Sequence, residues 1–191
     1  MIHVYTGNGK GKTTAALGLC LRAIGAGMRV YIMQFMKSLD YSEQAVLKSF
    51  GTHLVNLHTT GKPFFVAPEG TMSDAEREKW GDDVEVFPAG KPPAEYVALL
   101  SRGLSEVTQS MTAGNYHMII LDEINVALHF GLISRHQMET LLACLPKDVE
   151  LICTGRYAPD WLIEQADLVT EMTEVKHYYT RGIEARRGIE N

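Results

Sequence analysis

The sequence predicts a three-layer α/β fold, in which a parallel β-sheet is covered by helices on both faces. Short runs that are apolar throughout alternate with longer stretches of helical periodicity, a pattern typical of strands buried on both faces. A stretch rich in glycine and lysine, TGNGKGKTT at residues 6–14, joins the first apolar run to the first helical stretch. The length of 191 residues suits one well-buried core and is short for two. We therefore expect a single domain over residues 1–191.

The elements follow one another in a regular order. Apolar runs predict strands at 2–5, 30–35, 53–57, 118–121 and 149–153, with a weaker strand at 168–172. Helical periodicity predicts helices at 13–24, 41–50, 93–111, 134–145 and 159–165.

The region from about 60 to 93 interrupts this alternation. It is rich in proline and glycine around one short helical candidate at 73–80, and it carries the aromatic residues Phe64, Phe65 and Trp80. A long irregular excursion in a compact domain is either a functional lid or a variable surface insertion. The aromatic residues favour the lid, and both interpretations stay open.

Composition limits the class of protein. A net charge of −5 argues against a chain that grips nucleic acid over a wide face. No apolar run approaches the length of a membrane span, and no secretory leader opens the sequence, so we expect a cytoplasmic protein without membrane contact. Cys20, Cys144 and Cys153 are too irregularly spaced for a disulfide framework or a metal site, and we expect reduced core residues.

The stretch at 6–14 predicts a phosphate-binding loop. A glycine-rich turn between a strand and a helix exposes backbone N–H groups at the positive end of the helix. Lys12 would bring a charge to the phosphates and Thr13 a hydroxyl group for Mg²⁺. The loop sequence departs from the general motif, because Thr6 occupies the position of the first glycine in that motif. The residues expected to bind ATP here are Thr6, Gly7, Asn8, Gly9, Lys10, Gly11, Lys12, Thr13 and Thr14.

Two other interpretations of the loop are less favoured. Gly7 and Gly9 also begin a dinucleotide-binding fingerprint, but its third glycine would fall on Lys12, and the second strand ends without the acidic residue that holds a ribose. An ordinary glycine-rich turn would leave the lysines in solvent without a purpose.

Polar residues at other strand ends support triphosphate binding. The run at 118–121 ends in Asp122 and Glu123, and carboxylates placed there predict a Mg²⁺ partner to the loop. Neighbouring strand residues point to opposite faces, so one carboxylate should reach the metal directly, and which one stays open. Arg156 could meet phosphate or form a salt bridge with Asp122, Glu123 or Asp160. Gln34 could line the ATP site or satisfy loop backbone.

These motifs, in their order along nearly the whole chain, resemble those of the ATP:corrinoid adenosyltransferases of the CobA/CobO/BtuR type. The resemblance rests on the variant loop and on Gln34-Phe35-Met36-Lys37, Leu121-Asp122-Glu123, Thr154-Gly155-Arg156, Ala166-Asp167, Val175-Lys176-His177 and Gly188-Ile189. It implies a P-loop fold of the RecA-like type. It also implies transfer of the 5′-deoxyadenosyl group of MgATP to the Co(I) of cob(I)alamin or another corrinoid, with release of triphosphate, in adenosylcobalamin synthesis or salvage.

The resemblance implies roles and partners as well. Lys10, Lys12 and Arg156 would stabilise the charge on the departing triphosphate. Phe64 and Phe65, with Trp80 in reserve, would cover the lower face of cobalt, although they could instead hold the insertion down as a hydrophobic plug. A reductase, such as a flavoprotein, would supply the electron, and the enzyme would be a homodimer. The likeness fades at 60–93, where members of the family typically have a shorter segment.

Two other functions remain as alternatives. A P-loop ATPase or phosphotransferase would use the same loop to break the bond to the γ-phosphate, with Glu123 available as a base. A RecA-like nucleic-acid module would use ATP only to change shape, and the negative charge and the lack of a basic, aromatic stripe argue against it.

Overall fold

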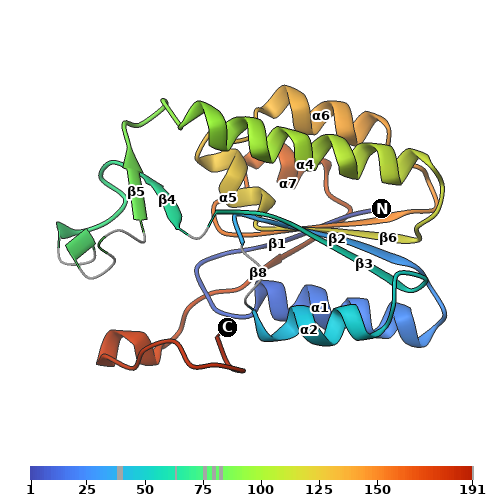
Figure 1. The fold of residues 1–191 in the computed structure, drawn as a ribbon, viewed down its shortest axis with the longest axis horizontal. Helices are drawn as coiled ribbons and strands as arrows, with labels where there is room; N and C mark the ends of the chain where they lie inside the picture. Colours follow the sequence, from blue (N-terminus) through green and yellow to red (C-terminus); the bar gives the residue numbers. More distant parts are fainter. Residues whose placement is uncertain (38–40, 63, 75–76, 79–80, 82–83, 191) are drawn as a thin grey trace.

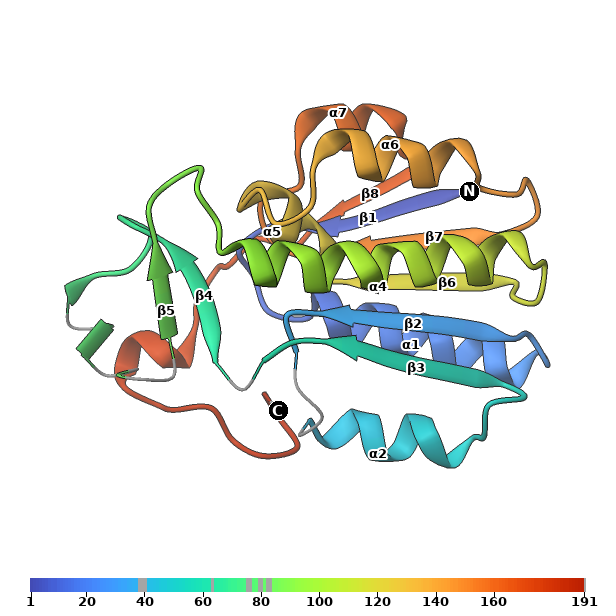
Figure 2. The ribbon, with the colours of Figure 1, turned by 45° about the horizontal axis from the view of Figure 1, so that its top comes forward.

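Six parallel strands form the central sheet, which Figure 1 shows edge-on, and Figure 2 shows their order, β3-β2-β6-β7-β1-β8. The structure is a computed structural model that describes residues 1–37, 41–62, 64–74, 77–78, 81 and 84–190, with Phe65 described by its backbone alone. The strands are β1 (Ile2–Thr6), β2 (Val30–Phe35), β3 (Val55–Thr60), β6 (Met118–Asp122), β7 (Glu150–Thr154) and β8 (Leu168–Glu171). The predicted fold class, an α/β fold with a parallel sheet, is confirmed, and the RecA-like P-loop type stays a prediction.

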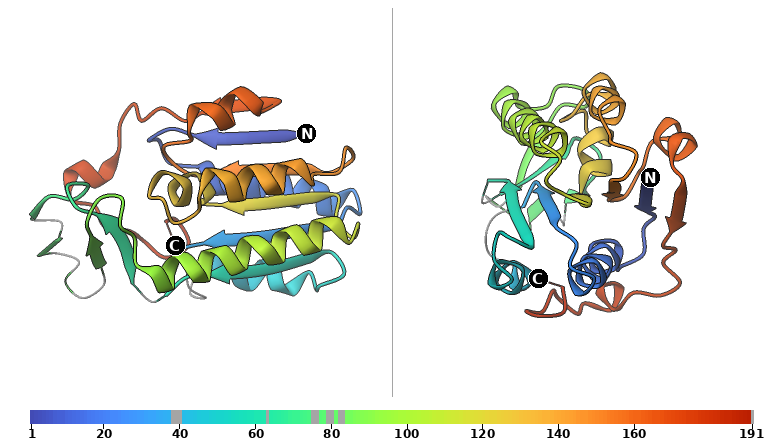
Figure 3. Two further views of the ribbon diagram at one scale, coloured as in Figure 1. Left: turned by 90° about the horizontal axis from the view of Figure 1, so that it is seen from above. Right: turned by 90° about the vertical axis from the view of Figure 1, so that its right-hand side faces the viewer.

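Helices cover both faces of this sheet. Figures 1 and 3 show α1 (Lys12–Gly25) and α2 (Ser42–Ser49) on one face, and α4 (Ala94–Thr112), α5 (Ile124–His129), α6 (Arg135–Ala143) and α7 (Asp160–Gln165) on the other. Alternate strand residues point to opposite faces, so Ile119 and Leu121 join the core under α4 while Ile120 packs with Ala16 of α1. Each face of the sheet therefore has its own hydrophobic core.

All six strands end at the same edge of the sheet, the left side in Figure 1, where the loop after β1 lies. β7 separates β1 from β6 in the sheet. Three non-glycine residues just beyond strand ends have positive φ: Met36 (58°), Glu123 (63°) and Tyr157 (61°). Such backbone strain is uncommon and gathers at functional sites. It marks this edge of the sheet.

The insertion is more regular than the sequence predicts. It contains β4 (Phe65–Pro68) and β5 (Val84–Phe87), which pair in parallel beyond the ends of the main strands (Figures 1 and 2). Strands of four residues are too short to show a clear period. A short 3₁₀ helix, η2 (Tyr178–Arg181), lies in the C-terminal segment, below β4 and β5 in the view of Figure 1.

Three other expectations need correction. β3 begins two residues later and ends three residues later than the predicted strand at 53–57. The short helix α5 was not predicted. Cys20 and Cys153 are buried as expected, but Cys144 is exposed because it caps α6 at the surface, so its prediction as a core residue is wrong. In the described ranges, none of the helices has the length and apolar character needed to cross a bilayer.

Candidate functional site

Backbone carbonyls of the loop after β1 hold the side chain of Lys12 in place. The Nζ atom of Lys12 donates to the backbone carbonyls of Gly7 at 2.8 Å and Gly9 at 2.7 Å, and Lys12 is 8% exposed. Burial, followed by the nearby charge of Arg156, lowers the pKa of Lys12. α1 starts at Lys12, with Gly11 in a left-handed conformation before it, so the positive end of the helix faces the loop. This is a preformed site for an anion.

Two of the loop glycines are required by a close approach of the chain after β8. A Cβ atom on Gly7 would lie 2.5 Å from the carbonyl oxygen of Met172, and one on Gly9 would lie 2.7 Å from it. The Gly9 amide donates to that same oxygen at 2.6 Å. The loop is therefore packed against the end of the edge strand, which no local pattern in the sequence reveals.

Thr6, which occupies the position of the usual first glycine, connects the start of the loop to the chain segments after β7 and β8. It is 8% exposed; its carbonyl accepts from the Met172 amide at 2.8 Å and its hydroxyl accepts from the Ala158 amide at 3.2 Å. These contacts suit a structural role, and its contact with ATP stays a prediction.

Asp122, at the end of β6, is the centre of a buried hydrogen-bond network. Its Oδ1 accepts from Thr13 at 2.8 Å and from Thr154 at 2.6 Å, while its Oδ2 accepts from Lys37 at 2.6 Å and from Gln34 at 3.1 Å. Burial alone would raise the pKa of Asp122, but the Lys37 charge and the hydrogen bonds outweigh it and hold the pKa low. Asp122 thus ties the loop helix to three strands.

Glu123 differs from its neighbour in both geometry and charge. β6 ends at Asp122, and Glu123 is the left-handed residue that opens α5, so its side chain is not constrained by strand alternation. It is partly exposed and lines the cavity described below. Burial of its carboxyl group, and then the charge of Asp122, raise its pKa above the ordinary value. Of the two carboxylates, Glu123 is the one that lines the cavity.

An open cavity of about 820 Å³ extends from the loop across the strand ends. Arg156 is exposed on its wall, next to Tyr157, whose ring stacks on that of His129 with centroids 4.4 Å apart. Tyr157 combines positive φ with a side chain that is 48% exposed. Both aromatic side chains line the cavity.

The outer wall of the cavity comes from distant parts of the chain. Ala67, Thr71 and Met72 of the insertion contribute to it, as do Ile189 and Glu190 near the other end of the sequence. Among these, Ile189 and Glu190 contact Lys10 of the loop. The cavity therefore joins the loop, the insertion and the C-terminal segment.

The candidate lid residues are only partly described. Phe64 is half-buried and packs towards α4, where the centre of its ring lies 6.2 Å from the centre of the Tyr96 ring. That contact favours the role of a plug that anchors the insertion. The side chain of Phe65 and the whole of Trp80 lie outside the described residues, so their roles stay predictions.

The structure brings most of the predicted site residues to one edge but at different depths. Asn8, Gly9, Lys10, Gly11, Lys12, Thr13, Thr14, Glu123 and Arg156 line the cavity, while Asp122 and Gln34 lie behind them. Sequence reasoning missed His129, Tyr157 and Glu190. The position of Tyr157 directly after Arg156, close to the end of β7, could have indicated it. The sequence around Glu190 contains no pattern that predicts its position at the cavity.

Comparison with known proteins identifies the family of the chain. The family model described as "ATP:corrinoid adenosyltransferase BtuR/CobO/CobP" matches residues 1–191. The chain belongs to this family. A corrinoid adenosyltransferase of Pseudomonas aeruginosa is 33% identical over 191 residues, covering 100% of this chain and 83% of the relative. One of Sinorhizobium is 31% identical, covering 100% of this chain and 79% of the relative.

Two further similarities are more distant or partial. An uncharacterized protein of Nostoc is 35% identical over 188 residues, and these cover 92% of this chain but 44% of that longer protein. A KaiC-like protein of Pyrococcus horikoshii is a structural neighbour with a TM-score of 0.46 and 16% identity, covering 89% of this chain and 71% of its own.

Proposed function

We propose that the protein is an ATP:corrinoid adenosyltransferase, which transfers the 5′-deoxyadenosyl group of MgATP to the Co(I) of cob(I)alamin or a related corrinoid and releases triphosphate. The proposal rests on membership of the family and on one feature of the site. This feature is an anion-binding loop at one end of a cavity of about 820 Å³ that continues far beyond the loop. Adenosylcobalamin synthesis or salvage would be its setting.

The loop residues would act on the leaving group. Lys12 would exchange its two carbonyl acceptors for phosphate oxygens, and the N-terminus of α1 would add its partial positive charge. Arg156 on the cavity wall would bring a planar set of donors to the same polyanion. The triphosphate then departs as a group, because its charge is neutralised while the bond to the 5′ carbon breaks and the bond from cobalt to that carbon forms.

The rest of the cavity would position the second substrate. The 5′ carbon must face the cobalt in line with the departing oxygen, with water excluded. The stacked rings of His129 and Tyr157 offer a flat aromatic surface in this part of the cavity. We propose that the insertion completes the enclosure and that Phe65, with Trp80, covers cobalt during its reduction.

The residues at the strand ends fit a Mg²⁺ ion. The Thr13 hydroxyl and the carboxyl groups of Asp122 and Glu123 are the hard oxygen donors that Mg²⁺ prefers, and Mg²⁺ in nucleotide sites takes few protein ligands. The described part of the chain holds no group of three or more His, Cys, Asp or Glu side chains that could bind a metal ion by themselves. Glu123 faces the cavity, whereas Asp122 would act through Thr13. A bound Mg²⁺ would supply positive charge to the departing triphosphate.

Several features of the proposal are implied by the family alone. We propose a homodimer, a cytoplasmic location and a reductase, such as a flavoprotein, as electron donor. We also propose that residues 1–191 act as one catalytic domain, because the cavity takes wall residues from both ends of the chain and from the insertion.

One assay tests the chemistry. The protein is incubated with MgATP and chemically reduced cobalamin, and the Co(I) absorption spectrum is followed while the phosphate products are separated. We expect an alkylcobalamin spectrum and one triphosphate for each cobalamin converted. Release of phosphate or diphosphate would instead support the alternative of an ATPase or phosphotransferase, with Glu123 as its base.

A second assay tests the lid. Phe65→Ala should leave the reaction with pre-reduced cobalamin intact and should slow the reaction that starts from Co(II) with a reductase. Phe64→Ala is the matched variant, because Phe64 packs on Tyr96 and its loss should lower stability rather than the Co(II) reaction specifically. Equal losses for Phe65→Ala in both reactions would contradict the proposed role.

A further inference from the structure

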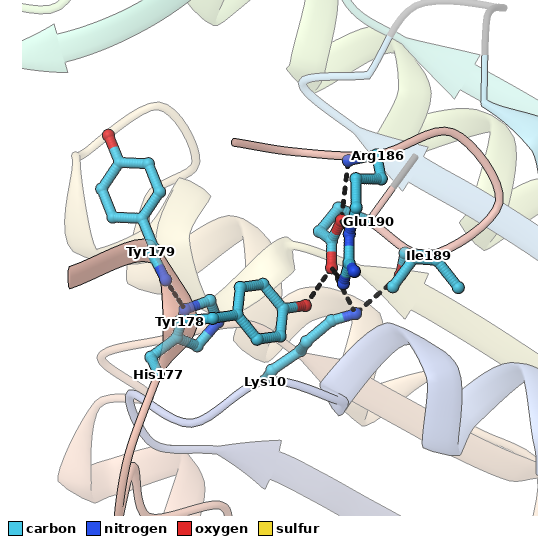
Figure 4. A network of polar contacts seen from close by, with 7 residues as sticks. All are labelled: Lys10, His177, Tyr178, Tyr179, Arg186, Ile189 and Glu190. Atoms are coloured by element: carbon cyan, nitrogen blue, oxygen red, sulfur yellow. Dashed lines mark hydrogen bonds and ion pairs between the residues drawn. The ribbon is translucent and has the colours of Figure 1, made fainter. Parts of the chain in front are cut away.

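The C-terminal segment, residues 177–190, lies against the phosphate-binding loop and holds one of its two lysines. The Nζ atom of Lys10 donates to the Ile189 carbonyl at 2.6 Å and lies 3.5 Å from a carboxylate oxygen of Glu190 (Figure 4). Both of these segment residues line the same cavity as the loop. A carbonyl and a carboxylate oxygen thus stand next to a cation that faces the proposed polyphosphate site.

Glu190 is fixed by donors of the segment itself. Its carboxylate accepts from the Tyr178 hydroxyl, from the Arg186 amide at 2.7 Å and from the Arg186 guanidinium at 3.3 Å. The guanidinium also lies over the Tyr178 ring, 4.8 Å from its centre. The hydrogen bonds from Arg186 and then from Tyr178 lower the pKa of Glu190 to about 2, so it is an anion at neutral pH.

The two loop lysines are held in different ways. Lys12 is buried and bonded to carbonyls of the loop, whereas the side chain of Lys10 is 37% exposed and is bonded to the segment. A polyphosphate that engages Lys10 must therefore take it from Glu190. Two anions at one lysine repel each other, so they cannot both bind it at full strength.

This inference rests on the proposed binding of a polyphosphate at the loop. We propose that Glu190 is a positioning residue that acts as an internal, displaceable anion: it occupies Lys10 in the free protein, yields it to the polyphosphate, and takes it back when triphosphate leaves. Because Ile189 and Glu190 form part of the cavity wall, the exchange also moves that wall. An internal competitor weakens the binding of the polyanionic product and so favours its release.

Inorganic tripolyphosphate with Mg²⁺ is the probe, because it tests the loop without adenosine or corrinoid. We expect Glu190→Gln to bind tripolyphosphate about three- to tenfold more tightly than the parent protein in calorimetry, since the competing charge is gone. Tyr178→Phe should give a smaller gain, because it removes one brace of Glu190. Glu164→Gln, the same charge change on the exposed side of α7 across the sheet, should have no effect.

Hydrogen exchange gives an independent measurement on the parent protein. Tripolyphosphate should speed amide exchange in residues 177–190 while it slows exchange in the loop, because the two sites compete for Lys10. A purely structural role of Glu190 predicts the opposite sign in calorimetry, with weaker binding after its replacement.

Two sets of results separate the possible failures. Unchanged or weaker binding by Glu190→Gln, or slower exchange in residues 177–190 with tripolyphosphate, would overturn the displacement while leaving the loop assignment intact. A parent protein that binds no tripolyphosphate would overturn the displacement together with the proposed use of the loop.

Discussion

The inner and outer walls of the cavity are built in different ways. The inner wall consists of strand ends and the loop, where Asp122 receives hydrogen bonds from α1, from β7 and from Lys37 after β2, and where loop carbonyls hold Lys12. The outer wall consists of short strands, half-exposed side chains and a segment that returns from the far end of the chain. The difference indicates that charge stabilisation is preorganised at the inner wall, while the outer wall can adapt to a large second substrate.

The largest expected effect comes from the preorganised charge. Lys12→Ala should lower the rate of adenosyl transfer to pre-reduced cobalamin by about a hundred- to a thousandfold, because the polyanion loses its closest cation. The rate is measured from the alkylcobalamin spectrum. Lys48→Ala, on the exposed side of α2, is the control and should keep the parent rate. A Lys12→Ala protein with normal turnover would refute the inner wall as the source of catalysis.

The next effect concerns the stability of the inner wall. Asp122→Asn should lower the free energy of unfolding by about 3 kcal/mol, because it leaves the buried ammonium group of Lys37 without its counter-ion. Urea denaturation followed by circular dichroism measures the change. Adding Lys37→Met to this variant should recover part of the loss. If the single variant were as stable as the parent, the network around Asp122 would not hold the wall together.

A matched pair of glycine substitutions tests the contact between the loop and β8. Gly9→Ala should lower the free energy of unfolding by about 1–3 kcal/mol, because its Cβ atom would meet the Met172 carbonyl. Gly18→Ala should raise it by about 0.5–1 kcal/mol, since Gly18 lies within α1 and a Cβ there meets nothing within 4 Å. Thermal melts of the two variants give the comparison, and equal shifts would contradict it.

The smallest expected effect depends on pH. The pKa of Glu123 is raised in the folded protein, so its ionisation costs stability as pH rises through the window between the unfolded and folded values. Glu123→Gln should therefore be more stable than the parent at pH 7, by roughly 1 kcal/mol, and this gain should vanish below the ordinary pKa of 4.5. Urea titrations at pH 7 and pH 4 measure both values. A constant gain at both pH values would show that its charge is not the cause.

The inner wall was largely predictable from sequence, because it is made of local patterns. An apolar run followed by the loop at 6–14, and another followed by Asp122, are each visible within a few residues. Parallel strands then bring their ends to one edge without further information. What sequence reasoning could not supply was the pairing of Lys37 with Asp122, because the two residues are 85 positions apart and either carboxylate could have been the partner.

The outer wall was less predictable because it is formed by short strands and by contacts between residues far apart in the sequence. β4 and β5 are too short to show a period, and their pairing is parallel, so no tight turn marks it. The contact of Lys10 with Ile189 joins residues 179 positions apart. Because Lys10 lies in a phosphate-binding loop, sequence reasoning assigned it to the ligand alone and did not predict its contacts with Ile189 and Glu190.

The approach of Met172 to the loop has a consequence for how many donors the nucleotide can use. The Gly9 amide donates its hydrogen bond to the Met172 oxygen, just after β8, and not towards the phosphate site. One backbone donor of the loop is therefore already used and is not available to a phosphate oxygen. The deuterium uptake of that single amide should accordingly stay slow whether or not nucleotide is present. The cationic side chains of the loop must then carry a correspondingly larger part of the recognition.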